Sequence, residues 1–364
     1  MTAHSASNLT HYREAARNVG QFGKGIWRYW RFGEPSPESN VVVQKLYAYT
    51  DGRSNDILFR LLESRRREPD VKLGWEGTAL ESDDGLSPGS LESAVHTLRE
   101  DGIVVLPARL KKEALRDLYA LGSSCKLTTT TYGPLTAGQR SGTVSTLPVV
   151  DTGTSDGMDP SRPLHSVYAV PRSLLLENQY LQALLADPYL LTVATRYLGV
   201  FPVITKPDMW WDTEFVPPGL RPRPYHTDSG CLRWLKVGIN LTETTFGTPH
   251  FVYVKGSHKA NKATRTLTRQ FLSRMNLSDQ EVTDLCADKV VHITASEGSI
   301  TLADTRGIHK GELSMRGNRL VLYFGLEGSA FNNIDHPIQL NHVGSELAKA
   351  MSARPFSYQF LRRA

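Results

Sequence analysis

Short β-rich runs dominate the second half of the chain and restrict the folds that it can form. Six runs rich in Val, Ile, Leu, Thr and aromatic residues lie between residues 200 and 328, and Gly, Pro, Asn and Ser separate them. This texture is typical of antiparallel strands joined by turns. The runs are VFPVITK, LRWLKVGINLT, HFVYVKG, KVVHITA, SITLADT and NRLVLYFGLEG.

Amphipathic helices are predicted before these runs and once among them. Ser90 is expected to cap the first helix and Gly102 to end it, while Pro188 breaks the third. Ser278 and Glu281 form a capping box in the insertion. The helices are predicted over residues 90–102, 111–121, 173–198 and about 264–287. Together these elements favour a mainly β fold with helical buttresses, a double-stranded β-helix or cupin-like jelly roll.

A composition shift near residues 81–90, ESDDGLSPGS, is typical of a linker. The predicted organisation is an N-terminal extension over 1–85, the β-helix domain over 86–330 and a tail over 331–364. Within the extension, GIWRYWRFG at 25–33 interleaves aromatic residues with arginines. This segment could lie on a membrane surface or stack on bases, but we expect the aromatics to pack the extension onto the main domain.

Composition excludes several functional classes. The chain has 364 residues, 40% of them hydrophobic, but no apolar window long enough to cross a bilayer. Its three cysteines form no CxxC pair, so neither a disulfide framework nor a zinc ribbon is predicted. We therefore expect a cytoplasmic protein. The net charge of +5 is mild, so a small-molecule partner is expected, with no nucleic acid and no membrane, and oligomeric state stays open.

The segment YHTDSG, residues 225–230, contains a His-x-Asp pair that could bind a metal. Residues two apart in a strand share a face, so His226 and Asp228 can offer one nitrogen and one carboxylate to the same ion. Such a short motif also arises by chance, and a third ligand must come from further along the chain. The downstream candidates are His250, His258, His292, His309, His336 and His342.

Among these candidates, His309 has the most suggestive setting. It ends a predicted turn, strand and loop, and Arg319 follows at the start of the run LVLYFGLEG. An arginine that begins a barrel strand can grip a carboxylate with two parallel hydrogen bonds. Arg316 lies in the polar turn just before it and is expected to face solvent. Two histidines, one carboxylate and such an arginine are the set that an iron oxygenase with a dicarboxylate cosubstrate needs.

Several segments occur in the order found in a known enzyme family. HTLREDGIVVLP, HTD, TPHFVYVKGSHK and EGSITLADTRGIHKGELSMRGNR, between residues 96 and 319, resemble the phytanoyl-CoA dioxygenase-like branch of the iron(II)/2-oxoglutarate oxygenases. Lys255 stands where that family usually has proline. The likeness covers about residues 90–328, and neither the N-terminal extension nor the tail has a counterpart.

The resemblance implies a site and a set of cofactors. His226, Asp228 and His309 would be the catalytic iron(II) ligands, Arg319 would anchor 2-oxoglutarate, and O2 would be the oxidant. His258 would lie near the site entrance without binding the metal. Because Asp228 is present where related halogenases have a small residue, hydroxylation or another C–H oxidation is favoured over halogenation.

Other residues that could contact substrate or cosubstrate are suggested by strand alternation or by their place in the sequence near His226. Trp234 and Lys236 share a face of their run and could contact cosubstrate or substrate, or this run could be an edge strand with one solvated face. Trp210 and Tyr225 are candidate substrate-binding aromatics, although buried aromatics are more often core. Arg223, with Arg221 beside it, could receive an anionic substrate.

The predicted function is an iron(II)- and 2-oxoglutarate-dependent dioxygenase that oxidises an unactivated C–H bond of a small organic substrate. Hydroxylation, ring formation or desaturation in natural-product biosynthesis is the leading interpretation, because members of the resembled family often have such roles. An acyl-CoA or lipid substrate is the alternative. Two rivals from other classes are a catalytically silent jelly-roll binding protein and a cupin-type metalloenzyme that needs no keto acid.

Overall fold

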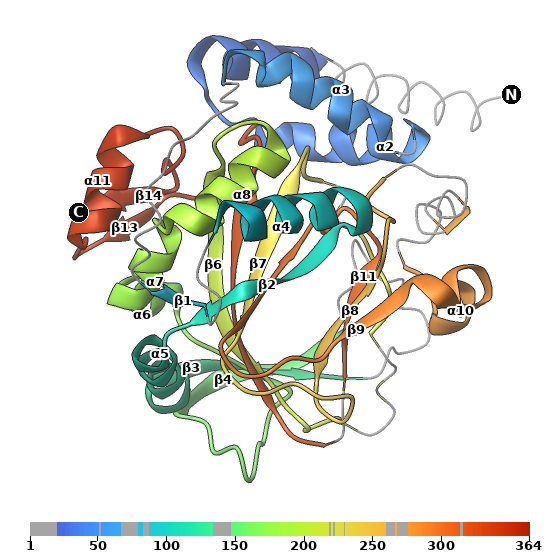
Figure 1. The fold of residues 1–364 in the computed structure, drawn as a ribbon. Helices are drawn as coiled ribbons and strands as arrows, with labels where there is room; N and C mark the ends of the chain where they lie inside the picture. The colour runs from blue at the N-terminus through green and yellow to red at the C-terminus, as the bar shows by residue number, and fades with distance from the viewer. Residues whose placement is uncertain are drawn as a thin grey trace, which may run out of the picture.

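Two antiparallel sheets form the centre of the computed structural model (Figure 1). It describes residues 20–50, 52–66, 79–82, 87–133, 147–217, 220, 223–228, 230–259, 266–267, 276–313 and 316–364. The three-stranded sheet has the order β11 (His309–Glu312), β8 (His250–Val254) and β9 (Val290–Ile293). The nine-stranded sheet has the order β1 (Leu80–Glu81), β2 (Ile103–Leu110), β10 (Ser299–Ala303), β7 (Trp234–Asn240), β12 (Arg319–Glu327), β6 (Val203–Asp212), β5 (Val167–Ala169), β3 (Lys126–Tyr132) and β4 (Val149–Asp156).

The predicted double-stranded β-helix is confirmed. Each of the six β-rich runs contains one strand: β6, β7, β8, β9, β10 and β12 in chain order. β7 lies between β10 and β12, so it is a central strand, and the edge-strand alternative is wrong. Every residue of β12 is buried, as expected for a strand that is covered on both faces.

Several strands were not predicted, among them β3, β4, β5 and β11. His309 was expected in a loop, but it begins β11. β3, β4 and β5 extend the large sheet beyond β6. The Thr-rich segment of β3 lacks a run of large apolar residues, and β4 is almost wholly exposed, so neither strand has the apolar alternation that marks a half-buried strand.

Most of the helices lie on the outer side of the large sheet, but the helix over 279–286 lies beside the three-stranded sheet and the helix over 345–353 lies beside the C-terminal strands (Figure 1). Ser87, not Ser90, caps the first one, and Ser90 supplies the reciprocal bond of the capping box. Gly102 ends that helix with φ 80°, as predicted. Asp187 caps the helix that Pro188 begins, which confirms the predicted break. The helices are α4 (Pro88–Asp101), α5 (Lys112–Ser124), α6 (Arg172–Leu176), α7 (Gln179–Leu185), α8 (Pro188–Leu198), α10 (Asp279–Cys286) and α11 (Ser345–Ala353).

The N-terminal helices lie across one end of the sheets (Figure 1). They are a helix over 20–32, α2 (Asn40–Thr50) and α3 (Arg53–Leu62). Tyr29 is buried, donates to Glu63 Oε1 at 2.6 Å, and accepts the Ala330 N–H at 3.1 Å. Trp27 and Phe32 are each 58% exposed, so the predicted docking by aromatics holds for Tyr29 but not for these two.

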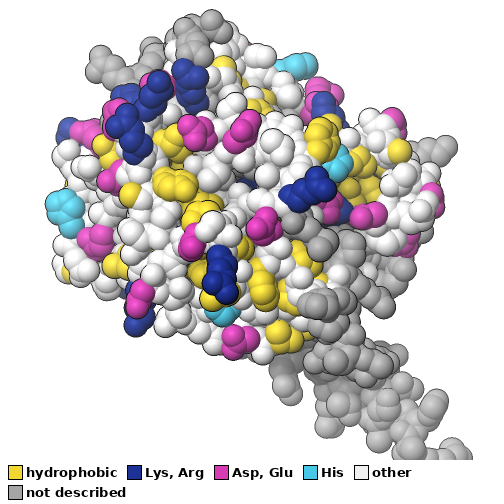
Figure 2. All heavy atoms as spheres, turned by 90° about the horizontal axis from the view of Figure 1, so that it is seen from below, with side chains coloured by type: hydrophobic (Ala, Val, Ile, Leu, Met, Phe, Trp, Pro, Cys, Tyr) yellow, Lys and Arg dark blue, Asp and Glu magenta, His cyan; other side chains and the backbone are white. Residues whose placement is uncertain are grey.

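One hydrophobic core joins the segments, and its buried members run from Tyr29 to Leu361. The tail contributes through α11 and the parallel pair β13 (Ile338–Leu340) and β14 (Leu361–Arg363). In the described ranges, no helix is long and apolar enough to span a bilayer. On the face seen in Figure 2, basic and acidic side chains are interspersed.

Candidate metal centre

Backbone pairing brings the His-x-Asp segment beside the start of β11. His226 and His309 exchange two backbone hydrogen bonds, of 2.8 and 2.9 Å. The Asp228 N–H donates to the Thr305 carbonyl at 2.8 Å. As a result, one ligand atom from each of His226, Asp228 and His309 lies within 4.8 Å of the others, and His309 Nε2 is 3.7 Å from Asp228 Oδ2.

The Nδ1 atom of each imidazole lies within hydrogen-bond distance of a backbone carbonyl. His309 Nδ1 lies 2.9 Å from the Gly307 carbonyl, and His226 Nδ1 lies 3.4 Å from that of Pro224. A carbonyl can only accept, so each Nδ1 carries the proton and each Nε2 keeps its lone pair. This arrangement fixes the tautomer that a metal-binding histidine needs.

The protonation states also suit a metal. Burial and the neighbouring His309 lower the pKa of His226 to about 3, and burial likewise lowers the pKa of His309. Burial opposes the charge of Asp228, but His309 and Lys236 outweigh it and hold the pKa of that carboxyl below its ordinary value. Near neutral pH the cluster therefore offers two neutral imidazoles and one carboxylate, a donor set that fits iron(II).

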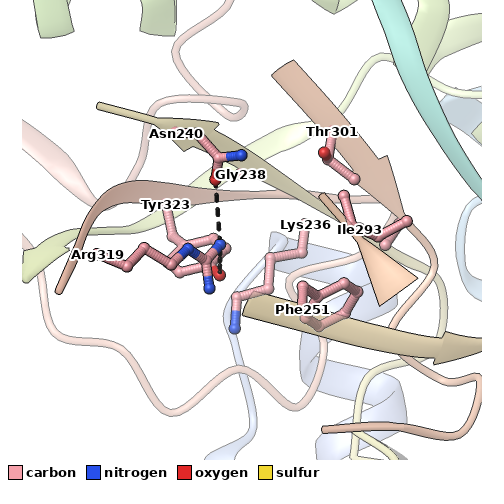
Figure 3. Close-up of a pocket in the computed structure, with 9 residues that line it drawn as sticks. Lys236, Gly238, Asn240, Phe251, Ile293, Thr301, Arg319 and Tyr323 are labelled. Atoms are coloured by element: carbon pink, nitrogen blue, oxygen red, sulfur yellow. Dashed lines mark hydrogen bonds between the residues drawn. The ribbon is translucent and has the colours of Figure 1, made fainter. Parts of the chain in front are cut away.

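Arg319 lies at the start of β12 and is 5% exposed. Its Nη2 donates to the Tyr323 hydroxyl at 2.9 Å and to Asn240 Oδ1 at 3.3 Å, while its Nε has no partner. Figure 3 shows these three side chains converging, with Lys236 beside them. A buried N–H donor without an acceptor destabilises the protein, so this guanidinium is well placed to bind a carboxylate.

A cavity of about 340 Å³ joins the histidines to this arginine. It also contains Tyr132, Asp212, Phe251 and Tyr323, which had not been singled out as site residues. Strand alternation offered a clue for Tyr323, which shares a face with Arg319. Six of the predicted site residues line the cavity: Trp210, Arg223, His226, Lys236, His309 and Arg319.

A polar network builds the outer wall of the cavity. The Asp212 carboxylate accepts from Arg223 Nη2 at 2.9 Å and from Trp210 Nε1 at 3.1 Å. The Trp210 ring lies 4.8 Å from that of Tyr323, and Arg223 stacks over Tyr132 at 5.5 Å. Arg223 is thus held by a carboxylate of the chain itself, and its charge is largely balanced.

Three predicted positions lie away from this cavity. Tyr225 packs in a second core with Leu277 and Val282, because it neighbours His226 and so points to the other face. Trp234 does lie on the interior face of β7, but it pairs with Glu327, at the opposite end of β12 from Arg319. His258 packs against Gly102. Arg221 lies outside the described residues.

Comparison with known proteins adds distant likenesses. Neither a protein-family model nor a curated protein matches the chain. Among solved structures, the non-heme α-ketoglutarate-dependent carbocyclase SnoK from nogalamycin biosynthesis is 18% identical with a TM-score of 0.41, covering 69% of this chain and 87% of its own. EctD from S. alaskensis with bound Fe is 14% identical at 0.40, over 72% and 83% of the two chains. AviO1 from Streptomyces viridochromogenes Tue57 is 16% identical at 0.39, over 66% and 96%. Each likeness is one of fold.

Proposed function

We propose that the protein is an iron(II)- and 2-oxoglutarate-dependent oxygenase in which His226, Asp228 and His309 hold the iron. The observation that carries this proposal is the cavity that has both imidazoles on one wall and the unpartnered Nε of Arg319 on another. The spacing of the ligand atoms, within 4.8 Å, suits one ion. The motifs that resemble the phytanoyl-CoA dioxygenase-like family support the same reading.

The chain's own groups have defined tasks in this proposal. Arg319, held by Tyr323 and Asn240, receives the far carboxylate of 2-oxoglutarate, and Lys236 adds a second positive charge to the same cavity. When bound, iron(II) would couple the conversion of 2-oxoglutarate and O2 to succinate and CO2 with a two-electron oxidation of the substrate. In hydroxylation the second oxygen atom would go to the substrate, and in ring formation or desaturation it would leave as water. The barrel orients both organic molecules and limits the access of water.

The expected substrate is a small polar organic molecule, as in natural-product tailoring by hydroxylation, ring formation or desaturation. Charged and amide side chains border the site on both cavities, among them Asp212 and Lys236 in the larger one and Lys206 and Asn332 in a smaller one beside Asp228. Such walls disfavour the acyl chain of the lipid alternative. A silent binding protein would not need one buried and one half-buried histidine with free Nε2 atoms beside a carboxylate. A metalloenzyme without a keto acid would not need the spare donor of Arg319.

The test is anaerobic addition of iron(II) and 2-oxoglutarate, followed by the weak visible charge-transfer band of the chelated cosubstrate. We expect the band in the wild type, its loss in Asp228→Ala, and a strongly raised cosubstrate requirement in Arg319→Ala. Arg316→Ala, at an exposed position, is the matched control. A wild type without a band at saturating cosubstrate, and without succinate in air, would show the assignment to be wrong.

A further inference from the structure

Lys206 has an unusual backbone conformation. Its φ is 48°, and in the described ranges no other residue except glycine has a positive φ. The pairing of β12 with β6 shifts register at this point: Tyr323 pairs with Asp208, and Gly325 with Thr205. A bulge of this kind redirects a side chain, and a strained non-glycine residue needs compensation from its surroundings or a function.

The redirected ammonium group lies beside the Trp234 ring, 4.8 Å from its centroid. Within the part of the chain that the structure describes, Lys206 Nζ has no hydrogen-bond acceptor or ion-pair partner. Burial opposes its charge, but the acidic groups around it, including Cys231 and Glu327, raise the pKa of Lys206. The side chain is therefore a half-buried cation whose donors are free.

Lys206 lines a second cavity, of about 150 Å³, which also reaches the candidate metal centre through Asp228. His226 and His309 line the larger cavity, whereas Asp228 lines this one. Asn40 and Gln44 of α2 form part of its wall, as does Asn332. The second cavity thus combines one cation with several amides next to a proposed iron ligand.

Glu327 is one of the carboxylates around Lys206, and it already accepts hydrogen bonds from other residues. Glu327 Oε1 accepts from Thr205 Oγ1 and from Asn333 Nδ2, each at 2.8 Å. Burial raises the pKa of Glu327 and of Asp335, and the charge of Lys206 opposes that shift. Asp228 would be committed to the metal. Among the described residues, none of these carboxylates bonds to the Lys206 ammonium, which leaves its donors for an external anion.

We propose that Lys206 receives a carboxylate group of the substrate in this second cavity, so that substrate and cosubstrate reach the metal centre through different cavities. The proposal rests on the proposed function only in identifying that carboxylate as the substrate's. At about 30 Å³ per water molecule, the cavity has room for about five, which suits a carboxylate with a short chain. Trp234, which was predicted to contact substrate or cosubstrate, would pack against that chain.

Cys231, which lines the same cavity, makes a test in metal-free protein feasible. Burial raises the pKa of its thiol, so slow labelling by iodoacetamide can be followed by peptide mass spectrometry. Propionate should slow the labelling of Cys231 by about tenfold, and propionamide, the uncharged analogue, should not, because only the anion forms a charge-assisted bond with Lys206. Cys125, outside the cavity, serves as the internal control.

Variants locate the effect. Lys206→Met should abolish the protection by propionate, Lys206→Arg should retain most of it, and Lys349→Met, at an exposed position, should match the wild type. Equal protection by propionamide, or full protection in a folded Lys206→Met, would overturn the proposal. Because labelling needs no iron, protection without a charge-transfer band would refute the oxygenase and keep the anion site. A charge-transfer band without protection of Cys231 would refute the anion site and keep the oxygenase.

Discussion

The Arg319 guanidinium donates to the hydroxyl of Tyr323 at 2.9 Å, and both side chains project from the same face of β12. The bond holds the guanidinium along the strand and leaves its Nε without a partner at the cavity. A positioned arginine loses less rotamer entropy when it binds a carboxylate than a free one does. The hydroxyl therefore belongs to the proposed cosubstrate site without touching the metal.

Tyr323→Phe should raise the KM for 2-oxoglutarate by about threefold to tenfold, because it removes one hydrogen bond to a charged group. Arg319→Lys should raise it further, by about tenfold or more, since lysine cannot make two parallel bonds. Succinate formation against cosubstrate concentration measures both. An unchanged KM in Arg319→Lys would contradict the assignment, and Arg316→Lys is the control.

Asp304→Asn should destabilise the fold by about 3–5 kcal/mol, because it leaves the buried guanidinium of Arg306 with only the exposed Asp56 carboxylate, 3.5 Å away, as a counter-ion. Arg306 bonds to the Asp304 carboxylate at 2.6 and 2.9 Å, and both residues are buried. Urea denaturation measures the change. The double variant Asp304→Asn/Arg306→Met should recover part of the loss, and a smaller loss in the single variant than in the double would count against this account.

Gly307→Ala should cost about 1–3 kcal/mol and weaken metal binding. A Cβ at this position would collide with the Tyr253 hydroxyl, which is buried and donates to the Asp304 carbonyl at 2.8 Å. The backbone at residue 307, two positions before His309, would therefore have to move. Thermal unfolding with and without a divalent metal measures both effects. Gly247→Ala, where the nearest atom is 3.6 Å away, should be close to neutral.

Asp187 should make stability depend on pH in the acidic range. Burial raises its pKa to about 6 from an ordinary 3.8, so the folded state binds a proton that the unfolded state has lost. This stabilisation is complete below the ordinary value and is lost as the pH rises through 6, a change of about 3 kcal/mol. Asp187→Asn, which can still cap α8, should lack this pH dependence in urea denaturation. An unchanged profile would contradict the account.

The alternation of apolar and polar residues predicted the strands and the face on which each candidate residue lies. It did not predict where along the barrel each residue lies. Alternation placed Trp234 and Lys236 on one interior face correctly. Only the pairing register shows that Trp234 lies opposite Glu327 while Lys236 reaches the cavity. Register depends on pairing between segments far apart in sequence, which a local pattern does not contain.

The residues of the proposed metal centre could be singled out because they occur in short motifs, whereas the contacts that support them are not local. Tyr225 could have been excluded by the same rule that paired His226 with Asp228, since adjacent strand residues point to opposite faces. The bond between Arg223 and Asp212 had no such clue, because β6 and the loop before His226 meet only in the folded chain. Lys206 was likewise hidden within an ordinary β-rich run, since a bulge has no clear local signature.

The hydroxyl of Tyr29 bonds to residues that lie at the far end of the chain, among them Ser329 at 3.2 Å and Ala330 at 3.1 Å. During synthesis, the N-terminal helices must therefore wait for almost the whole polypeptide before their binding surface exists. Contacts of such long sequence separation slow folding and leave apolar side chains exposed in the meantime. The emerging N-terminus is consequently where we expect this protein to depend most on chaperones.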